Sequence, residues 1–511
     1  MSNRPLVLIA ATVDSGGGAG ITADCITVFD TGAFPLPLAC ALAPESLTRV
    51  GSVSSVSTEA LKESLKMACH DWQQPVGAVK VGLIPRQDAL EVLLHALETD
   101  LSSVPVVWDP VLTATAGPLE SADLKANLSR ILKHVTIFTP NLPEALTLAG
   151  WDEARLEKEG TEALGRVFTA MGAKAVIIKG GHRAERKLAL DVFVSAELTF
   201  TMEHEKTAGD GAHGGGCALS SALASFIAQG YALQDAAVLA KAYVTEGIAK
   251  PAVKADNGRP PIGHHGPCTD LTFFPVVREP GFPEGHEQPF APCVERMGLY
   301  PVLSDLNTMQ SLLSLGVRTL QLRIKDKNDP NLLGKIKRAV FLGRQFNARI
   351  FIDDYVDLAI EAGAYGVHLG MEDLRDADLE KIYQAGLHLG VSTHGPYELL
   401  KALQLKPSYI ALGHIFPTNS KKMPSKPQGV EKLAYQKAIA GSYPTTAIGG
   451  IKLHNVESVL KAQDCSVALI TGITDAGPEE IWAVAEKWLK LCGSGDPEPG
   501  SSFCVGHDRE Q

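Results

Sequence analysis

Short apolar runs alternate with longer amphipathic stretches along the first half of the chain. The amphipathic stretches include 58–68 and 218–228, where apolar residues recur with the period of a helix. Strands that alternate with helices predict a parallel sheet covered by helices, which is an α/β fold. The predicted strands are 7–11, 78–83, 106–108, 135–139 and 175–179.

The second half shows a tighter rhythm of the same kind over residues 296–492. Each strand-like run is followed by a helix-compatible stretch, and polar residues gather where the runs end. This pattern predicts a (β/α)8 barrel with its site at the carboxyl ends of the strands. The predicted barrel strands are 299–304, 319–323, 349–353, 366–369, 388–392, 409–413, 445–448 and 467–470.

Two segments lack any periodicity. Residues 269–295 contain repeated Pro and Gly, which predicts a linker. Residues 493–511 are rich in Gly, Pro, Ser and charge, which predicts a disordered tail. The predicted domains are therefore 1–268 and 296–492.

Bulk composition narrows the class of protein. A chain of 511 residues is too long for one ordinary core, and 45% hydrophobic with 21% charged residues is typical of a globular enzyme. The net charge of −11 argues against nucleic-acid binding. The nine cysteines show no metal-binding spacing, and the first apolar run is too short for a signal peptide or a membrane span. We expect a cytoplasmic enzyme of small molecules, without a membrane partner, and the sequence leaves a homo-oligomer open.

Three polar side chains mark the end of the second predicted barrel strand. Gln321, Arg323 and Lys325 alternate, so on one strand they face the same side. An amide and two cations at one strand end suit a pyrophosphate, since guanidinium and ammonium groups match phosphate oxygens in geometry and charge.

Carboxylates mark the ends of the next two strands. Asp353 and Asp354 close the third strand, and Asp373 follows the fourth. Carboxylates at neighbouring strand ends can share one Mg²⁺, which prefers oxygen ligands. The alternative, that Asp353 caps a helix and Asp373 is a solvated loop acid, stays open at this point.

Hydroxyls, a lysine and paired glycines follow the remaining strands. Paired glycines let backbone N–H groups approach a phosphate at the place where barrels often bind one. These residues are Ser392, Thr418, Ser420, Lys421, Gly449, Gly450 and Thr471. Single clusters of this kind are weak signals, but their order along the barrel is specific.

With these motifs in this order, residues 296–490 resemble thiamine phosphate synthase. The resemblance implies that hydroxymethylpyrimidine pyrophosphate condenses with hydroxyethylthiazole phosphate to thiamine phosphate and pyrophosphate. It implies pyrophosphate and pyrimidine binding by Gln321, Arg323, Lys325, Asp353, Ser392 and Lys421, Mg²⁺ binding by Asp354 and Asp373, and thiazole-phosphate binding by Thr418, Ser420, Gly449, Gly450 and Thr471. The chain departs from the family at Asp353, where Asn is usual. Thiazole tautomerase-like barrels are the nearest alternative, and the Gln-Arg-Lys triplet with the two aspartates favours the synthase.

Two glycine-rich turns stand out in the first domain. Residues 14–20 follow the first strand, and His213 to Cys217 precede an apolar helix. Free N–H groups at the positive end of a helix form an anion hole, and their field is expected to lower the pKa of Cys217. A tight structural turn and a buried structural cysteine are the alternatives.

Together with 80–83, 109–112, 139–145 and 179–182, these turns make residues 5–267 resemble hydroxymethylpyrimidine/phosphomethylpyrimidine kinase. The resemblance implies a ribokinase-like α/β/α domain that transfers phosphate from ATP. It implies that Cys217 is the base and that Gly214 to Gly216 stabilise the transferred phosphoryl group. It further implies aminopyrimidine binding by Asp24, and ATP and Mg²⁺ near Asn141, Glu144 and Lys179.

Departures in this domain leave two interpretations. Glu45 stands where the family has a pyrimidine-contacting Gln, and Thr115 stands where Lys is common. Either the domain is an active kinase, which makes the chain bifunctional in thiamine biosynthesis, or it is a pyrimidine-binding or regulatory module fused to an active synthase. The expected partners are the hydroxymethylpyrimidine compounds, hydroxyethylthiazole phosphate and ATP.

Overall fold

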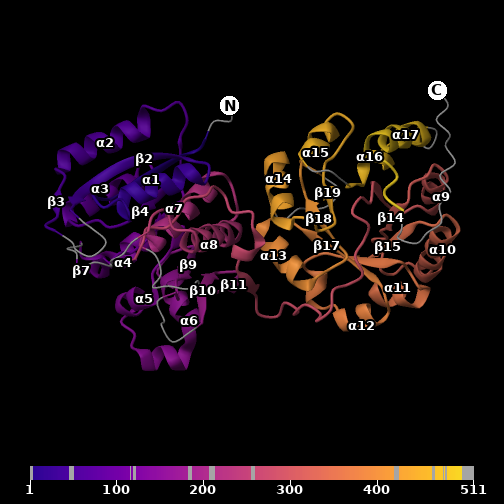
Figure 1. The fold of residues 1–511 in the computed structure, drawn as a ribbon, viewed down its shortest axis with the longest axis horizontal. Helices are drawn as coiled ribbons and strands as arrows, with labels where there is room; N and C mark the ends of the chain where they lie inside the picture. Colours follow the sequence, from indigo (N-terminus) through magenta and orange to yellow (C-terminus); the bar gives the residue numbers. More distant parts are fainter. Residues whose placement is uncertain are drawn as a thin grey trace. The chain divides into compact units, whose positions relative to one another are not determined.

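The computed structural model describes two compact units, Met1–Pro280 and Gly281–Gln511 (Figure 1). The described residues are 4–44, 51–114, 117–118, 122–181, 187–206, 213–254, 259–418, 425–462, 466–475, 477 and 480–497. The boundary between the units lies inside the segment predicted as a linker.

The first unit is built on a ten-stranded sheet, in the order β12-β11-β10-β9-β8-β5-β4-β1-β2-β3. Its strands are β1 (Leu6–Asp14), β2 (Phe34–Ala43), β3 (Ser54–Ser55), β4 (Val76–Val81), β5 (Val106–Trp108), β8 (Ile137–Phe138), β9 (Ala175–Ile178), β10 (Leu188–Ser195), β11 (Thr199–Glu205) and β12 (Val276–Arg278). A separate two-stranded sheet pairs β6 (Thr113–Ala114) with β7 (Gly117–Pro118).

The sheet is mixed, which corrects the prediction of a parallel one. From β2 through β1, β4, β5 and β8 to β9 the neighbours are parallel, whereas β9 to β12 and the β2–β3 pair are antiparallel. Short connections between β10, β11 and β9 permit antiparallel pairing, since only a parallel neighbour needs a long crossover. Strand β12 pairs with β11, so the first part of the predicted linker belongs to this sheet.

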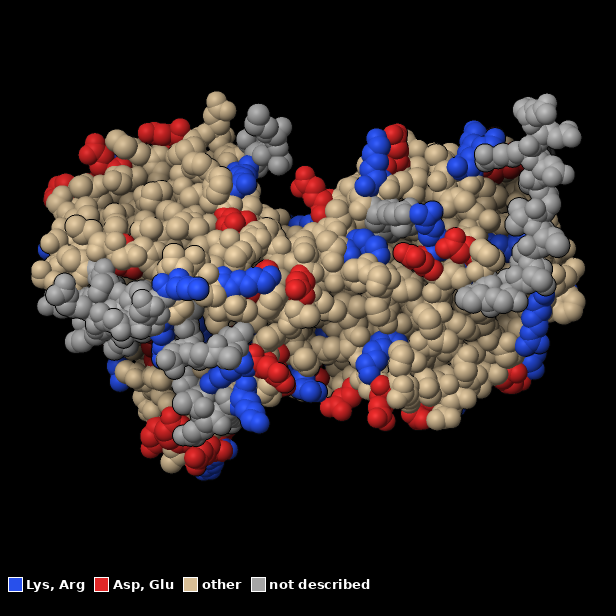
Figure 2. Space-filling view, in the orientation of Figure 1, with Lys and Arg blue, Asp and Glu red and all other residues tan. Residues whose placement is uncertain are grey.

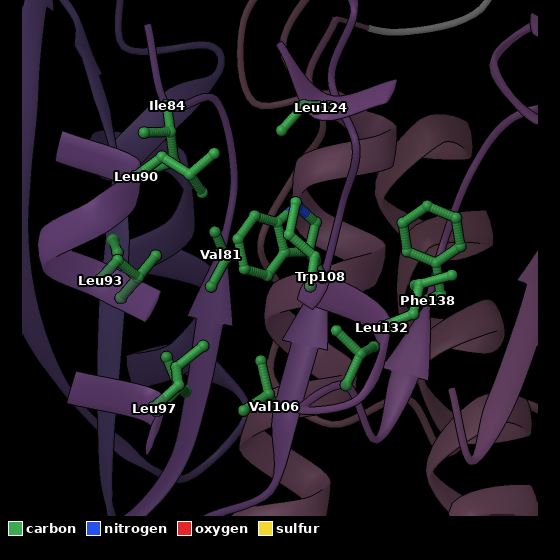
Figure 3. Close-up of a cluster of buried hydrophobic side chains, with 14 of the residues drawn as sticks. Val81, Ile84, Leu90, Leu93, Leu97, Val106, Trp108, Leu124, Leu132 and Phe138 are labelled. Atoms are coloured by element: carbon green, nitrogen blue, oxygen red, sulfur yellow. The ribbon is translucent and has the colours of Figure 1, made fainter. Parts of the chain in front are cut away.

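Helices cover both faces of the sheet. They are α1 (Gly20–Asp30), α2 (Thr58–His70), α3 (Gln87–Glu98), α4 (Leu124–Leu132), α5 (Leu142–Ala149), α6 (Glu153–Ala170), α7 (Gly215–Ala228), α8 (Leu233–Ala249) and the short η1 (Leu271–Phe273). Alternate strand residues such as Leu6 and Leu8 join the core formed with α2 to α6. Figure 3 shows part of this core, where Trp108 packs among aliphatic side chains. Helix α7 packs on both α1 and α8, and α1 and α7 pack against the sheet.

The second unit is a closed barrel of eight parallel strands in chain order, with β13 pairing to β20. The strands are β13 (Leu299–Leu303), β14 (Thr319–Leu322), β15 (Arg349–Asp353), β16 (Gly366–Leu369), β17 (His388–Thr393), β18 (Tyr409–Gly413), β19 (Thr445–Ile448) and β20 (Ser466–Leu469). Every predicted barrel strand is present, with ends within one residue of the prediction.

Helices follow the barrel strands. They are α9 (Leu306–Ser314), α10 (Leu332–Gln345), α11 (Val356–Ala362), α12 (Leu379–Gln384), α13 (Pro396–Leu405), α14 (Gly429–Ala440), α15 (Val456–Ala462), α16 (Thr471–Thr474) and α17 (Ile481–Cys492), with the short η2 (Asp373–Arg375). Asp305 and Asp378 cap two of them through hydrogen bonds to backbone N–H groups, as N-cap residues do.

The ends of the barrel unit are hydrogen-bonded to it. The carbonyl of Gly493 accepts from Leu299 N–H at 3.0 Å, and the carbonyl of Asp496 accepts from Arg349 Nη1 at 2.9 Å. Residues 493–497 are therefore held against the barrel, contrary to the predicted disorder. The rest of the predicted tail, 498–511, lies outside the described residues.

Within the residues that the structure describes, no helix is long and apolar enough to cross a membrane. On the face shown in Figure 2, acidic and basic side chains are interspersed. The net charge of −11 likewise gives the chain no overall positive field that would attract anionic ligands.

Candidate active sites

A cavity of about 470 Å³ opens at the carboxyl ends of the barrel strands. Most of the predicted synthase residues line it: Gln321, Arg323, Asp353, Asp354, Asp373, Ser392, Thr418, Gly449, Gly450 and Thr471. Their positions in sequence span most of the barrel, so it is the closed sheet that brings them together.

Three predicted residues are not placed there. Strand β14 ends at Leu322, so the strand alternation that predicts Lys325 in the site does not reach that residue. Lys325 is exposed and is not among the described residues that line the cavity. Ser420 and Lys421 lie outside the described residues.

Asp353 is the centre of the charged side of the cavity. Its Oδ2 accepts a hydrogen bond from Arg323 Nε at 2.8 Å, and its Oδ1 accepts one from Gln321 Nε2. Burial and the neighbouring charge of Asp354 raise the pKa of Asp353 to about 7, although Arg323 and Gln321 oppose the rise. The carboxyl orders two of the predicted pyrophosphate-binding side chains, so it does not act as a simple helix cap.

The two predicted metal ligands lie at the same rim. Asp354 has φ of 65°, in the left-handed region that Asp tolerates better than most residues. Its backbone N–H donates to the carbonyl of His368 at 3.1 Å, which ties the turn after β15 to β16. Asp373 begins η2 and is exposed to the cavity. Among the residues described, no group of three or more His, Cys, Asp or Glu side chains forms a complete metal site.

A line of hydrogen bonds crosses the cavity wall and includes three residues that were not predicted as site residues, Tyr300, His368 and Tyr409. The contacts are Tyr300 OH to Gln321 Oε1 at 3.2 Å, Tyr300 OH to Tyr409 OH at 2.7 Å, Tyr409 OH to His368 Nδ1 at 2.7 Å, and His368 Nε2 to Ser392 Oγ at 2.7 Å. The two tyrosines are buried inside the barrel and each is 1% exposed or less. Alternate inward-facing positions on barrel strands would have been the signal for them.

Paired glycines and Thr471 line a further part of the cavity, and a lysine contacts Thr471. Gly449 and Gly450 have φ of 102° and 65°, and a Cβ on either would collide with the 414–417 loop. The glycines thus bring two loops together. Thr471 Oγ1 accepts from Lys452 Nζ at 2.9 Å, and Lys452 also pairs with Asp475. Lys452 is a cation beside the predicted phosphate position that sequence reasoning missed.

In the first unit, the two glycine-rich turns lie against each other. A Cβ on Gly18 would collide with the ring of His213, and a Cβ on Gly214 would collide with the carbonyl of Gly18. Asp14 holds the first turn, since its carboxylate accepts from the N–H groups of Gly16 and Ala19. Burial acts to raise the pKa of Asp14, but hydrogen bonds from His213, Gly16 and Ala19 outweigh it and lower the pKa.

Helix α7 begins at the second turn, with Gly214 as N-cap at φ of 82° and no side chain capping its first N–H groups. The ammonium of Lys179 lies 3.2 Å from the position of a Cβ on Gly216. It pairs with Asp109 Oδ1 at 2.7 Å, and Ser220 Oγ lies 3.4 Å from Asp109 Oδ2. Predicted residues Lys179, Gly214 and Gly216 therefore meet at one helix end, together with Asp109, which was not predicted as a site residue.

The pKa of the Cys217 thiol differs from the prediction. Burial raises the pKa of its thiol to about 11, with Lys80 opposing and Asp24 and Asp109 adding to the rise. The expected lowering at the helix N-terminus is wrong, because loss of hydration and the two carboxylates outweigh the favourable field.

Asp24 is fully buried and both of its oxygens have partners. Lys80 Nζ donates to Oδ2 at 2.5 Å and Ser221 Oγ donates to Oδ1 at 2.7 Å. Neither the Lys80 nor the Asp24 side chain is exposed. Ser221 lies one helical turn after Cys217, so this buried ion pair abuts the helix face that carries the thiol.

Asn141 and Glu144 form a capping box at the start of α5. Asn141 Oδ1 accepts from Glu144 N–H at 2.9 Å, and Glu144 Oε2 accepts from Asn141 N–H at 2.8 Å. Burial raises the pKa of Glu144, against the charge of Lys179. Both residues thus border the Lys179–Asp109 pair. Glu45 and Thr115, on which the interpretation of this domain turned, lie outside the described residues.

Family models match both halves of the chain. Residues 14–263 match the model described as phosphomethylpyrimidine kinase, and residues 299–473 match thiamine monophosphate synthase. The thiamine-phosphate synthase of Citrobacter koseri is 52% identical over 211 residues, which is 41% of this chain and 99% of that protein. The thiamine-phosphate synthase of Photorhabdus laumondii is 55% identical over 188 residues, covering 37% of this chain and 87% of that protein. A solved phosphomethylpyrimidine kinase from Clostridium difficile is 28% identical, covers 48% of this chain and 99% of that chain, and has a TM-score of 0.41.

The two family matches and the synthase relatives define a biosynthetic transferase in two parts, an α/β kinase-type domain and a barrel. The chain belongs to the thiamine-phosphate synthase family through its barrel, and it carries a phosphomethylpyrimidine kinase domain before it. Both resemblances inferred from the motifs are confirmed.

Proposed function

We propose that the barrel joins hydroxymethylpyrimidine pyrophosphate to hydroxyethylthiazole phosphate, giving thiamine phosphate and pyrophosphate. The observation that carries this proposal is the single cavity that Gln321, Arg323, Asp354 and Asp373 line at neighbouring strand ends. The glycine turn and Thr471, which line the same cavity, would receive the thiazole phosphate.

The cavity suits Mg²⁺ as the resident cation. Mg²⁺ is usually held by one or two carboxylates together with phosphate oxygens, and Asp354 and Asp373 supply that number. When bound, Mg²⁺ neutralises charge on the leaving pyrophosphate. Arg323 would add a fixed positive charge, held in place by Asp353. The protein then needs no nucleophile of its own, because the aminopyrimidine can support a methylene cation that the thiazole nitrogen captures.

The synthase proposal is tested on the full chain with ready-made hydroxymethylpyrimidine pyrophosphate, thiazole phosphate and Mg²⁺. Thiamine phosphate should form without ATP. Arg323→Ala should lower kcat/KM by about a hundredfold, as expected when a charged hydrogen bond to the leaving group is lost. Normal turnover by that variant, or no turnover by the unaltered chain, contradicts the proposal.

We propose that the first domain has the ribokinase-like fold and phosphorylates hydroxymethylpyrimidine and its monophosphate with ATP. The start of α7, with its uncapped N–H groups and Lys179 beside Gly216, supports phosphate binding there. Cys217 in the first turn would take the proton of the accepting group. The two activities in one chain perform consecutive steps of thiamine biosynthesis.

The second candidate for this domain is a pyrimidine-binding module without phosphate transfer. It is favoured by Cys217, because burial raises the pKa of its thiol to about 11, so the thiol stays protonated near neutral pH and cannot act as a base. The full chain with hydroxymethylpyrimidine phosphate, ATP and Mg²⁺ decides between the two. ADP formation that is lost in Cys217→Ala establishes the kinase, whereas pyrimidine binding without ADP formation establishes the binding module.

A further inference from the structure

In the line of hydrogen bonds inside the barrel, the number of protons on each group determines which partner donates in each contact. It runs Arg323, Asp353, Gln321, Tyr300, Tyr409, His368, Ser392, and the six side chains after Arg323 come one from each of strands β13 to β18. Both Asp353 oxygens accept in this line, one from Arg323 and one from Gln321. Only the NH₂ group of Gln321 can donate to a carboxylate, so its Oε1 has to face Tyr300.

Each hydroxyl in the line has a single proton. Tyr300 donates its proton to Gln321 Oε1, so the contact between the two tyrosines is made by the proton of Tyr409. Tyr409 then has no proton left for His368, and Nδ1 of the imidazole must be the donor in their 2.7 Å contact. On a ring with one proton, Nε2 carries a lone pair, and Ser392 Oγ must donate to it.

We propose that Asp353, Tyr300 and Tyr409 are positioning residues that keep the proton of His368 on Nδ1 and direct the hydroxyl proton of Ser392 away from the cavity. Ser392 then faces the ligand as a hydrogen-bond acceptor. The group it receives is a donor, such as the amino group of an aminopyrimidine, and not a bare phosphate oxygen. The inference rests on the proposed synthase function and revises the expected role of Ser392 beside the pyrophosphate.

The surroundings of the tyrosines preserve this order. Both are fully inside the barrel, and burial raises the pKa of each well above its usual range, so both hydroxyls keep their protons. A low-dielectric setting strengthens each contact and polarises the next one. Reversal would require every proton in the line to move together.

Residue 353 decides the direction in this chain. The resemblance places Asn at this position in the family, and an Asn side chain can turn either its oxygen or its NH₂ group to Gln321. With Asn, Gln321 could present its NH₂ group to Tyr300, and the whole line could run the other way. Ser392 would then be free to donate into the cavity. Asp353 excludes that arrangement as long as its carboxyl is ionised and accepts from Gln321, so both tests are run well above its pKa of about 7.

The first test reads the tautomer of His368 directly. Long-range ¹H–¹⁵N correlation on the full chain labelled with ¹⁵N-histidine should show a proton on Nδ1 and a bare Nε2, with the signal assigned by its loss in His368→Gln.

Tyr409→Phe removes the Nδ1 acceptor and should give a mixture of tautomers. Tyr300→Phe serves the same purpose if Tyr409→Phe does not fold. Tyr443→Phe is the matched control, since Tyr443 OH donates to the carbonyl of Pro407 outside the line. A proton on Nε2, alone or as part of an imidazolium, in the unaltered chain overturns the proposal.

The second test measures the binding of inorganic pyrophosphate with Mg²⁺ by calorimetry. Ser392→Ala should change its Kd by less than about twofold in the unaltered chain, because Ser392 donates nothing to the anion. In an Asp353→Asn background the same substitution should weaken binding by about five- to tenfold, because the reversed line lets Ser392 donate. Equal losses in both backgrounds overturn the proposal.

The two tests separate this inference from the proposed function. The tautomer and the pyrophosphate titration need no turnover. If the protein shows Nδ1–H and the predicted coupling but makes no thiamine phosphate, the inference about Ser392 stands and the synthase proposal is wrong. If the protein makes thiamine phosphate but His368 carries its proton on Nε2, only the inference about Ser392 is wrong.

Discussion

At the scale of single residues, the barrel site contains a carboxyl whose ionisation opposes folding. The pKa of Asp353 is about 7 in the folded protein, against 3.8 for an ordinary Asp. The folded state therefore holds this proton more tightly than the unfolded state does. Its stabilising contribution is complete below pH 3.8 and is lost as the pH rises toward 7.

Asp353→Asn should remove this dependence. In EDTA, the variant should gain about 1–3 kcal/mol of barrel stability over the unaltered chain above pH 7, and the gain should shrink as the pH falls toward 4. The measurement is urea unfolding across that pH range, monitored by the fluorescence of a barrel tryptophan such as Trp488. A constant difference between the two proteins at all pH values would show that Asp353 keeps an ordinary pKa.

The buried pair beside Cys217 provides a second prediction about individual residues. Lys80 is the cation that lowers the pKa of this thiol against the effect of burial. Lys80→Met should therefore slow alkylation of Cys217 by iodoacetamide at every pH below about 11 and move the pH profile upward. Ser221→Ala removes a neutral partner of Asp24 and should leave the profile nearly in place. Equal profiles for the Lys80 variant and the unaltered chain would exclude this role.

At the scale of elements, the kinase-type site depends on two glycine turns in contact. Gly214→Ala meets both a positive φ of 82° and the carbonyl of Gly18, so the turns must separate. We expect a loss of about 1–3 kcal/mol and of kinase activity. Gly181→Ala is the control, because Gly181 is exposed and a Cβ there meets nothing within 4 Å. The measurements are ADP release and thermal unfolding of the Gly214→Ala and Gly181→Ala variants. A Gly214→Ala variant that keeps kinase activity would contradict the prediction.

The elements also show what the sequence could and could not predict. The barrel strands were predictable because each is a short apolar run ending in polar residues. The antiparallel strands β10 to β12 were not, because apolar alternation does not reveal which neighbour a strand will choose. The strand alternation that predicts Lys325 beside Gln321 does not extend to it, because β14 ends at Leu322, and its role in the site stays a prediction. The Lys80–Asp24 contact joins residues far apart in the chain, and only the sheet order brings them together.

At the scale of the whole molecule, the segment predicted as a linker is divided between the units. Its later part is held by the barrel: His286 stacks on Tyr383 at 3.8 Å, Phe290 is 2% exposed, and Phe290 N–H donates to the carbonyl of Lys406 at 3.0 Å. Cys293 N–H donates to the carbonyl of Ser408 at 3.1 Å. Phe290 and Cys293 therefore belong to the buried part of the barrel unit, and residues 286–293 are held against it.

This arrangement predicts where the barrel can be cut free. A chain that begins at Gly281 should keep synthase turnover and the thermal stability of the barrel transition in the full protein. A chain that begins at residue 296 loses the buried Phe290 ring and its backbone contacts, and should lose about 3 kcal/mol or more of stability. Phe290→Ala in the longer of these two chains should reproduce most of that loss, because the ring contributes the largest apolar area. Equal stability of the two truncated chains would mean that the segment only covers the barrel, and the functional boundary would then lie at 296.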